Sequence, residues 1–453
     1  MQFGTVQKLI SIFNQSFHEL GVSVSLEKLE DLSVTIHRAM TVQTRHFHTL
    51  EHVFTFVDPN NAIRSLAALY HDIVYFQVDM GFSPPIWELI SPYIRQENSE
   101  FYVVANVLPE DRIVLMTLDV FDLRPGQKLS SVTALNEFLS ALVMLKQLGG
   151  LVPEKDLLGM TVCIEATIPF RGFTADGKSH FEVMEERLSE IIKRYHLDIP
   201  DEELIETIKT AVIFANKDIE NFAESDPGRF LDNTWKLLPE TNAALRLPDV
   251  YSIGTYRQAL QKMETFFKNL DVNTVFSQFR GVPSDEDFNR MVFLASNNIQ
   301  VAGEYLGIKI LGITIMEALA KATGGDAPLS LFMGDVPREG VSIKRLEYYL
   351  PELEDSPWVD HNSIIYQLLE SGRSSDAIFD MKNSPLSLFV YKAIPPEQIT
   401  HDLLRAQDFY SGALSPVDFL KEIDPMVVHP IARASSIMVY TRRQSLLQFA
   451  GDN

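Results

Sequence analysis

Apolar residues recur at steps of three and four along most of this chain, which is the spacing that places them on one face of an α-helix. Clear examples are residues 203–222, 256–270 and 285–306. A sustained alternation of apolar and polar residues, which is typical of a half-buried strand, is missing, and only residues 22–26 and 102–107 form short β-like runs. The sequence therefore predicts an all-α protein.

The chain of 453 residues is long enough for two or three domains of about 150 residues each. The segments at 58–61 (Asp-Pro-Asn-Asn) and 225–228 (Ser-Asp-Pro-Gly) indicate loops between helices, and a further break lies at 247–249. We place the boundary near residue 250. This predicts a first helical domain of residues 1–250 and a second helical region of residues 251–453.

Composition and charge limit the kinds of molecule that this protein is expected to bind. With 39 basic and 61 acidic residues, the formal net charge is −22, and such a surface repels the phosphate backbone of nucleic acids. The single cysteine, Cys163, excludes an intrachain disulfide framework and a cysteine-rich zinc site, and it fits a reducing, cytoplasmic environment. Any metal ion must therefore be held by His, Asp and Glu.

Two apolar stretches need to be weighed as membrane segments. The N-terminal stretch has Asn14 and Gln15 inside its apolar run and is interpreted as an amphipathic helix. Residues 306–320 contain Lys309 and Glu317 and are fewer than the ~20 apolar residues that span a bilayer, so we expect a buried helix there. No membrane partner is expected.

Two histidines, His48 and His52, are four residues apart and would share one face if both lay on a helix. Such a pair can bind one metal ion together, or one imidazole can bind it while the other transfers protons. By itself the spacing is a weak signal, because two partly buried histidines without a function give the same pattern.

The adjacent pair His71-Asp72 ends an otherwise apolar helix that begins at residue 62. A carboxylate in such surroundings is costly unless a cation compensates it, and one Asp can also bridge two cations. The alternative is an aspartate that ends the helix and pairs with a lysine.

A third candidate, Asp218, lies on the apolar stripe of its helix, where a lone acid needs a cation or a strong donor. A buried pair with an arginine would also satisfy it. Glu165 and Asp119 lie on hydrophobic helices as well, and for both a structural role remains open. Asp122, before Arg124-Pro125-Gly126, is interpreted as a turn residue.

The motif Arg45-x-Phe47-His48-x-x-x-His52, followed by His71-Asp72-Ile73-Val74-Tyr75, resembles the HD superfamily of metal-dependent phosphohydrolases. It is similar to the bacterial branch with R-x-Y-H-N-x-x-H and H-D-x-V-Y motifs, and to the catalytic domain of cyclic-nucleotide phosphodiesterases. The resemblance covers roughly residues 35 to 245. It implies that His48 is the general acid and that His52, His71 and Asp72 bind the metal.

Two later segments extend the resemblance to the phosphodiesterase-like layout. Ile164-Glu165-Ala166-Thr167 resembles its I-x-A-T segment, and residues 215–222 resemble A-D-L-S-N-P. In that match Asp218 completes the metal shell and Asn221 stands for the Asn. The sequence departs at Tyr75, where the cyclic-nucleotide enzymes have a His near the second metal, and it has no match to their glutamine-centred purine clamp.

The resemblance implies a phosphoester hydrolase that acts on a small phosphorylated substrate, such as a nucleotide or cyclic nucleotide, with one or two divalent ions (Mg, Mn, Zn or Fe) and no organic cofactor. His48 would protonate the leaving oxygen. Arg45 would either contact the phosphate or pair with a core acid. Glu51 or Glu165 could orient an imidazole through its second nitrogen. The remaining candidates for the surroundings of the metal are Tyr75, Asp119 and Asn221.

Two other functions stay open. One is a regulatory or binding protein on a partly degenerate HD scaffold. The other is an HD-type di-iron oxygenase, which needs further histidine ligands, and His180 and His196 are the nearby candidates. Residues 251–453 carry no catalytic motif, so we expect that half to shape the pocket, to form a homo-oligomer or to bind a protein partner.

Overall fold

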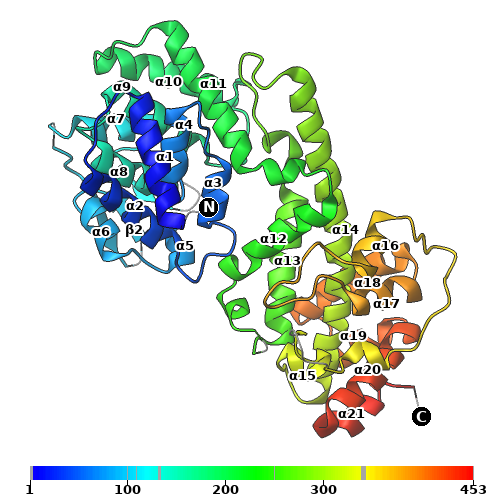
Figure 1. Ribbon diagram of the computed structural model, residues 1–453. Helices are drawn as coiled ribbons and strands as arrows, with labels where there is room; N and C mark the ends of the chain where they lie inside the picture. Colours follow the sequence, from blue (N-terminus) through cyan, green and yellow to red (C-terminus); the bar gives the residue numbers. More distant parts are fainter. Residues whose placement is uncertain are drawn as a thin grey trace. The chain divides into compact units, whose positions relative to one another are not determined.

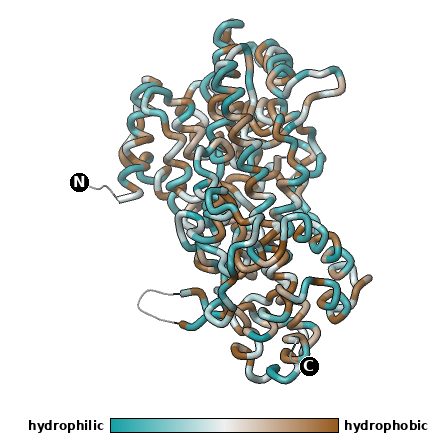
Figure 2. The backbone as a smooth tube through the Cα atoms, turned by 90° about the vertical axis from the view of Figure 1, so that its right-hand side faces the viewer, coloured by the Kyte–Doolittle hydropathy of each residue, from teal (hydrophilic) through white to brown (hydrophobic). Residues whose placement is uncertain are grey.

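The computed structural model describes residues 4–98, 100–108, 110–130, 134–248, 250–337 and 343–451 (Figure 1). It is 63% helical, with 21 α-helices and one small three-stranded sheet within these ranges. The prediction of an all-α protein is therefore confirmed. Along most helices hydrophobic and hydrophilic residues alternate every few positions, which is the amphipathic pattern of the sequence (Figure 2).

The contacts divide the chain into two units: unit 1 contains residues 1–223 and 271–293, and unit 2 contains residues 224–270 and 294–453. The division therefore differs from a single boundary near residue 250, because the chain leaves unit 1 earlier and returns to it once. The returning segment is anchored in unit 1 by Phe279, which is buried in its core, and by Ser277, whose backbone N–H and C=O both hydrogen-bond the Asn216 side chain.

Unit 1 holds the first eleven α-helices and the sheet. Its elements are α1 (Thr5–Glu19), α2 (Leu26–Met40), α3 (Leu50–Thr55), α4 (Ala62–Tyr70), α5 (Phe76–Asp79), α6 (Pro84–Ile90), β1 (Ile94–Glu97), β2 (Glu100–Val103), α7 (Arg112–Val120), β3 (Lys128–Leu129), α8 (Leu135–Leu148), α9 (Glu154–Ala166), α10 (His180–Arg194), α11 (Asp201–Asp218), and the 3-10 turns η1 (Glu220–Ala223) and η3 (Val272–Thr274).

Helix α9 is the central element of unit 1. It packs against α4, α7, α8 and α11, and its residues from Leu157 to Ala166 are all buried. Side-chain caps fix where neighbouring helices begin: Asn61 accepts from the N–H of Arg64 at the start of α4, as its place in the loop 58–61 predicts. Because α4 and α11 pack on the same helix, their C-terminal ends can contribute to one site.

The small sheet is antiparallel, in the order β1-β2-β3, with Ile94 opposite Val103 and Phe101 opposite Leu129. The β-like run at 102–107 contributes only its first two residues to β2. The run at 22–26 forms no strand, because Ser25 caps α2 and Leu26 begins that helix.

Unit 2 is also helical. Its elements are α12 (Pro227–Thr241), η2 (Ala243–Arg246), α13 (Ile253–Asn269), the part of α14 (Asp285–Thr323) from Leu294 onward, α15 (Leu329–Met333), η4 (Leu346–Tyr349), α16 (Ile364–Glu370), α17 (Pro385–Ala393), α18 (Pro396–Ser411), α19 (Pro416–Glu422), α20 (Pro425–Met438), η5 (Tyr440–Arg442) and α21 (Arg443–Leu447).

Helix α14 is long and apolar enough to cross a membrane by length and composition alone, but 78% of its most apolar window is buried within the protein. Every residue from Tyr305 to Ala320 is buried, so the expectation of a buried helix at 306–320 is confirmed. Its two charged residues are paired there: Glu317 with Arg257 and Lys309 with Asp380.

Candidate metal centre

Three separate elements of unit 1 bring histidine and aspartate side chains to one point. His52 comes from the short helix α3, His71 and Asp72 directly follow α4, and Asp218 is the last residue of α11. His71 continues the backbone conformation of α4, because its N–H still bonds the carbonyl of Ala67. The apolar helix α4 therefore places the pair in the interior of unit 1, where the His71 side chain is 1% exposed.

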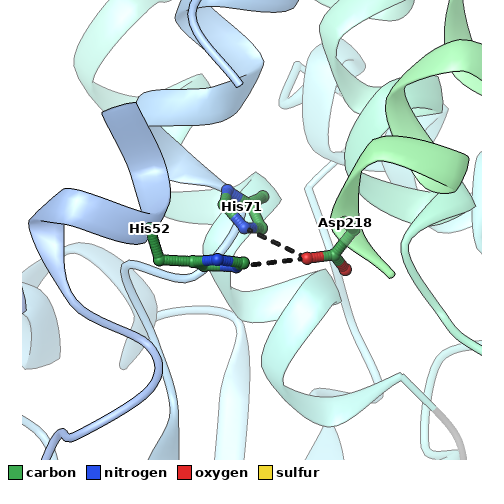
Figure 3. Close-up of side chains that lie close together, drawn as sticks. All are labelled: His52, His71 and Asp218. Atoms are coloured by element: carbon green, nitrogen blue, oxygen red, sulfur yellow. Dashed lines mark ion pairs between the residues drawn. The ribbon is translucent and has the colours of Figure 1, made fainter. Parts of the chain in front are cut away.

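The imidazoles of His52 and His71 point toward the carboxylate of Asp218 (Figure 3). The Nε2 atoms of His52 and His71 lie 3.3 Å and 3.8 Å from Oδ1 of Asp218. One ligand atom from each of the three residues lies within 4.8 Å of the others, which is close enough to share one cation. Oδ2 of Asp72 lies 3.1 Å from Nε2 of His71 and 3.8 Å from Nε2 of His52.

Three atoms at this point are buried and have no hydrogen-bond partner: Nε2 of His52, Nε2 of His71 and Oδ2 of Asp72. Buried polar atoms are normally satisfied, so a cluster of unsatisfied ones calls for an explanation. A metal cation satisfies lone pairs of imidazole nitrogen and carboxylate oxygen together. The donor set and its distances therefore fit a divalent ion.

A hydrogen bond fixes the orientation of His71. Its Nδ1 atom lies 2.8 Å from the carbonyl oxygen of Ala68, so Nδ1–H donates and Nε2 keeps its lone pair in the neutral imidazole. Metal-binding histidines typically use their second nitrogen in this way. The carbonyl of Ala68 thus does for His71 what the sequence led us to expect of Glu51 or Glu165.

In the metal-free site, the electrostatic environment favours the binding of a cation or a proton. Burial lowers the pKa of His71, but the carboxylates of Asp72 and Asp218 outweigh it and raise that pKa to about 9. Burial raises the pKa of Asp72, but the neighbouring His71 and His48 outweigh it and hold the pKa of Asp72 well below its usual range. Both carboxylates thus favour a positive charge at the point where the ligands meet.

His48 and His52 do not lie on one helix, so the shared helical face that their spacing allows is not formed. Helix α3 begins only at Leu50, after Thr49 in extended conformation, so His48 lies in the preceding bend. The two rings are nevertheless close, with centroids 6.0 Å apart, and the ring of His48 packs edge-on against Tyr75 at 4.4 Å. His48 therefore borders the cluster without belonging to it.

Arg45 was expected either to contact a phosphate or to pair with a core acid, and the structure favours the second role. Its side chain is fully buried and forms two hydrogen bonds to the carboxylate of Asp79, of 2.8 and 2.7 Å. Nη1 also donates to the carbonyl of Asp72 at 2.7 Å and to that of His48 at 3.4 Å. Arg45 thus holds the backbone of both site segments, and its guanidinium is not accessible to a substrate.

Glu165 and Asp119, two candidate acids, are bound by other side chains. Glu165 is buried and accepts hydrogen bonds from Arg171, and its Oε2 lies 3.0 Å from Nε2 of His180. Asp119 accepts from Arg194 and from the hydroxyl of Tyr195, each at 2.7 Å. Both carboxylates therefore have hydrogen-bond partners of their own, and neither belongs to the metal cluster.

The two other expected supporting residues, Glu51 and Asn221, are more accessible to solvent than the histidine His71. Glu51 is exposed on the first turn of α3 and does not face the imidazoles from within the core. Asn221 is half-buried in η1, one turn beyond Asp218.

One acid near the centre, Glu137 in the first turn of α8, was missed in the sequence. Burial, together with the negative charges of Asp72 and Asp218, raises its pKa to about 7, against the opposing effects of a backbone hydrogen bond and of the charge of Arg171. No histidine or motif flags this residue. The available signal was that α8 is apolar on almost every side, so a carboxylate within it is poorly solvated.

The further histidines that a di-iron site would need are not at this cluster. His180 bonds Glu165, and His196 is exposed after α10. Within the described ranges, His52, His71 and Asp218 form the metal-competent group of His, Cys, Asp and Glu.

Comparison of the chain with protein-family models, with curated proteins and with solved structures finds no match.

Proposed function

We propose that unit 1 binds one divalent cation through His52, His71, Asp72 and Asp218, and that it hydrolyses phosphoesters of small molecules. The observation that carries this proposal is that unsatisfied atoms of His52, His71 and Asp72, from α3 and the end of α4, lie beside the carboxylate of Asp218 at the end of α11. Two imidazoles with two carboxylates favour manganese, iron or zinc over calcium.

A bound divalent ion would supply Lewis acidity, which activates water near neutral pH and neutralises charge on phosphoryl oxygens. The residues of this chain do the positioning: Ala68 fixes the tautomer of His71, and Arg45 ties the segments of His48 and Asp72 together. Such preorganisation is what hydrolytic sites require.

His48 is the residue that we assign to proton transfer. It is adjacent to the cluster, its ring packs against Tyr75, and it helps to lower the pKa of Asp72. An imidazole placed next to a metal but not bound to it can carry the proton that a leaving alkoxide needs. In this proposal Nε2 or Nδ1 of His48 delivers that proton.

The test is phosphate release from a panel of phosphomonoesters, phosphodiesters and nucleotides by the manganese-, zinc- or iron-loaded protein. His48→Ala should keep its metal and lose turnover by about 10²-fold or more. His18→Ala, at an exposed histidine of α1, is the matched control and should behave as wild type. A loaded protein that hydrolyses nothing on the panel would contradict the hydrolase and favour the binding-protein alternative.

A further inference from the structure

Unit 2 contains a small pocket that none of the preceding function uses. It has a volume of about 40 Å³, enough for a few water-sized groups. Side chains of α13 and α14, the α15 region and the start of α17 line it. Much of its wall is apolar or aromatic, and its charged residues are Lys309, Arg345 and Asp380, beside polar residues that include Tyr256 and Ser384.

Lys309 supplies a buried positive charge to this pocket. The residue is 5% exposed, and its ammonium lies 3.0 Å from Oγ of Ser384 and 3.1 Å from Oδ2 of Asp380. An ammonium has three hydrogens, and within the described ranges these two residues are its hydrogen-bond partners. Lys309 thus places a hydrogen-bonded positive charge in the wall of the pocket.

The charge of Asp380 is shared with a second cation. The guanidinium of Arg373 lies 3.6 Å from Asp380 and stacks on the ring of Trp235, and its Nε and Nη1 atoms are buried without a hydrogen-bond partner. Two buried cations thus face one carboxylate, in a protein whose formal net charge is −22. This local excess of positive charge opposes the overall charge of the chain.

Tyr256 contributes an unsatisfied donor. The residue is 1% exposed, it lines the pocket, and its hydroxyl has no hydrogen-bond partner in the described part of the chain. Burial and the nearby Asp380 raise the pKa of Tyr256 well above its ordinary value, so the hydroxyl remains protonated and can donate. A buried hydroxyl left unpaired is costly unless something else accepts from it.

The start of α17 adds backbone donors. This nine-residue helix begins at Pro385, and its N-cap Ser384 makes no side-chain capping bond. The N–H groups of Leu386 and Ser387 therefore lack an intrahelical partner, and both residues line the pocket. An uncapped helix N-terminus attracts anions through these groups and through its dipole.

We infer that this pocket binds the phosphate group of a small ligand through Lys309, the hydroxyl of Tyr256 and the N-terminus of α17. Donors converge there from three elements, and a tetrahedral oxyanion can accept from all of them at once. The volume suits a single phosphate-sized group. The site lies wholly within unit 2 and does not depend on the metal chemistry proposed for unit 1.

The test is titration calorimetry of the full chain with inorganic phosphate, after dialysis against a chelator to remove divalent ions. The wild type should bind one equivalent. Tyr256→Phe should weaken binding about tenfold or more, because a hydrogen bond to a charged ligand is lost. Its melting temperature without phosphate should not fall, since the hydroxyl that is removed has no partner.

Tyr366→Phe is the matched control, since the hydroxyl of this buried tyrosine of unit 2 bonds Glu370 and does not line the pocket; it should bind phosphate as the wild type does. Asp218→Ala should also retain binding. The inference is overturned if millimolar phosphate gives no binding, if Tyr256→Phe binds as the wild type does, or if Asp218→Ala abolishes binding. Binding of acetate in preference to phosphate would overturn it too, in favour of a carboxylate ligand.

Discussion

The Nε2 atom of His52 lies 3.3 Å from Oδ1 of Asp218, although the two residues belong to helices that are far apart in the sequence. The same nitrogen is buried and makes no hydrogen bond. Lone pairs of a neutral imidazole and a carboxylate repel each other at that distance unless a proton or a cation lies between them. The positions of α3 and α11 therefore determine the distance between two groups of the candidate site.

Replacing Arg45 should lower the free energy of unfolding, because its buried side chain pairs with Asp79 and is not accessible to a substrate. Arg45→Met leaves the carboxylate of Asp79 without its partner, and breaking a buried pair in this way costs about 3 kcal/mol of unfolding free energy. Urea denaturation measures the change. Arg194→Met, which breaks the more exposed pair with Asp119, should cost less than about 1 kcal/mol. Equal effects of the two substitutions would contradict the structural role of Arg45.

The stability of the metal-free protein should depend on the titration of His71. The folded-state pKa of about 9 lies above the ordinary value of 6.5, so the stabilisation is fully present below pH 6.5 and is lost as the pH rises through 9. We expect a decrease of up to about 3 kcal/mol over this window, measured by urea denaturation in the presence of chelator. His71→Asn should remove this dependence. A wild-type stability that stays constant from pH 6.5 to above pH 9 would disprove the assignment.

The carboxyl of Glu137 should also make the metal-free protein less stable as the pH rises, but over a lower pH range. Its folded-state pKa of about 7 exceeds the ordinary 4.5, so the charged form is disfavoured and stability falls as the pH rises from 4.5 through 7. Glu137→Gln should therefore stabilise the protein by about 2 kcal/mol above pH 7, with no gain near pH 4.5. Glu51→Gln, at an exposed acid, serves as control. A Glu137→Gln gain that is independent of pH would point to packing rather than charge.

Local spacing predicted the helical class and marked His71-Asp72 and Asp218 as candidates, whereas their combination with His52 was what the resemblance to the HD superfamily implied. His71-Asp72 at the end of an apolar helix and Asp218 on an apolar stripe are visible as buried polar residues in an apolar pattern. His48 was misplaced because Thr49 takes an extended conformation and starts α3 later than the motif suggests. Local spacing alone does not reveal such a helix start.

The roles of the other acids could not be predicted from local spacing. Glu165 pairs with Arg171 in the segment after α9 and with His180, and Asp119 pairs with Arg194; His180 and Arg194 both lie on α10, and the packing of that helix brings them to these acids. The division into units escaped prediction for a similar reason. Segment 271–293 returns to unit 1, where Phe279 is buried in the core and Ser277 bonds Asn216. No local pattern in the sequence predicts these contacts.

The most direct test of the metal centre is elemental analysis of the purified full chain, with wild type beside Asp218→Ala and Asp119→Ala. Both substitutions remove an acid of unit 1 that is largely shielded from solvent, but only Asp218 belongs to the cluster. We predict about one equivalent of a divalent metal in the wild type and in Asp119→Ala, and a clear loss in Asp218→Ala. Absence of metal from the wild type, even after incubation with manganese, zinc or iron, would contradict the central claim, and so would equal retention by Asp218→Ala.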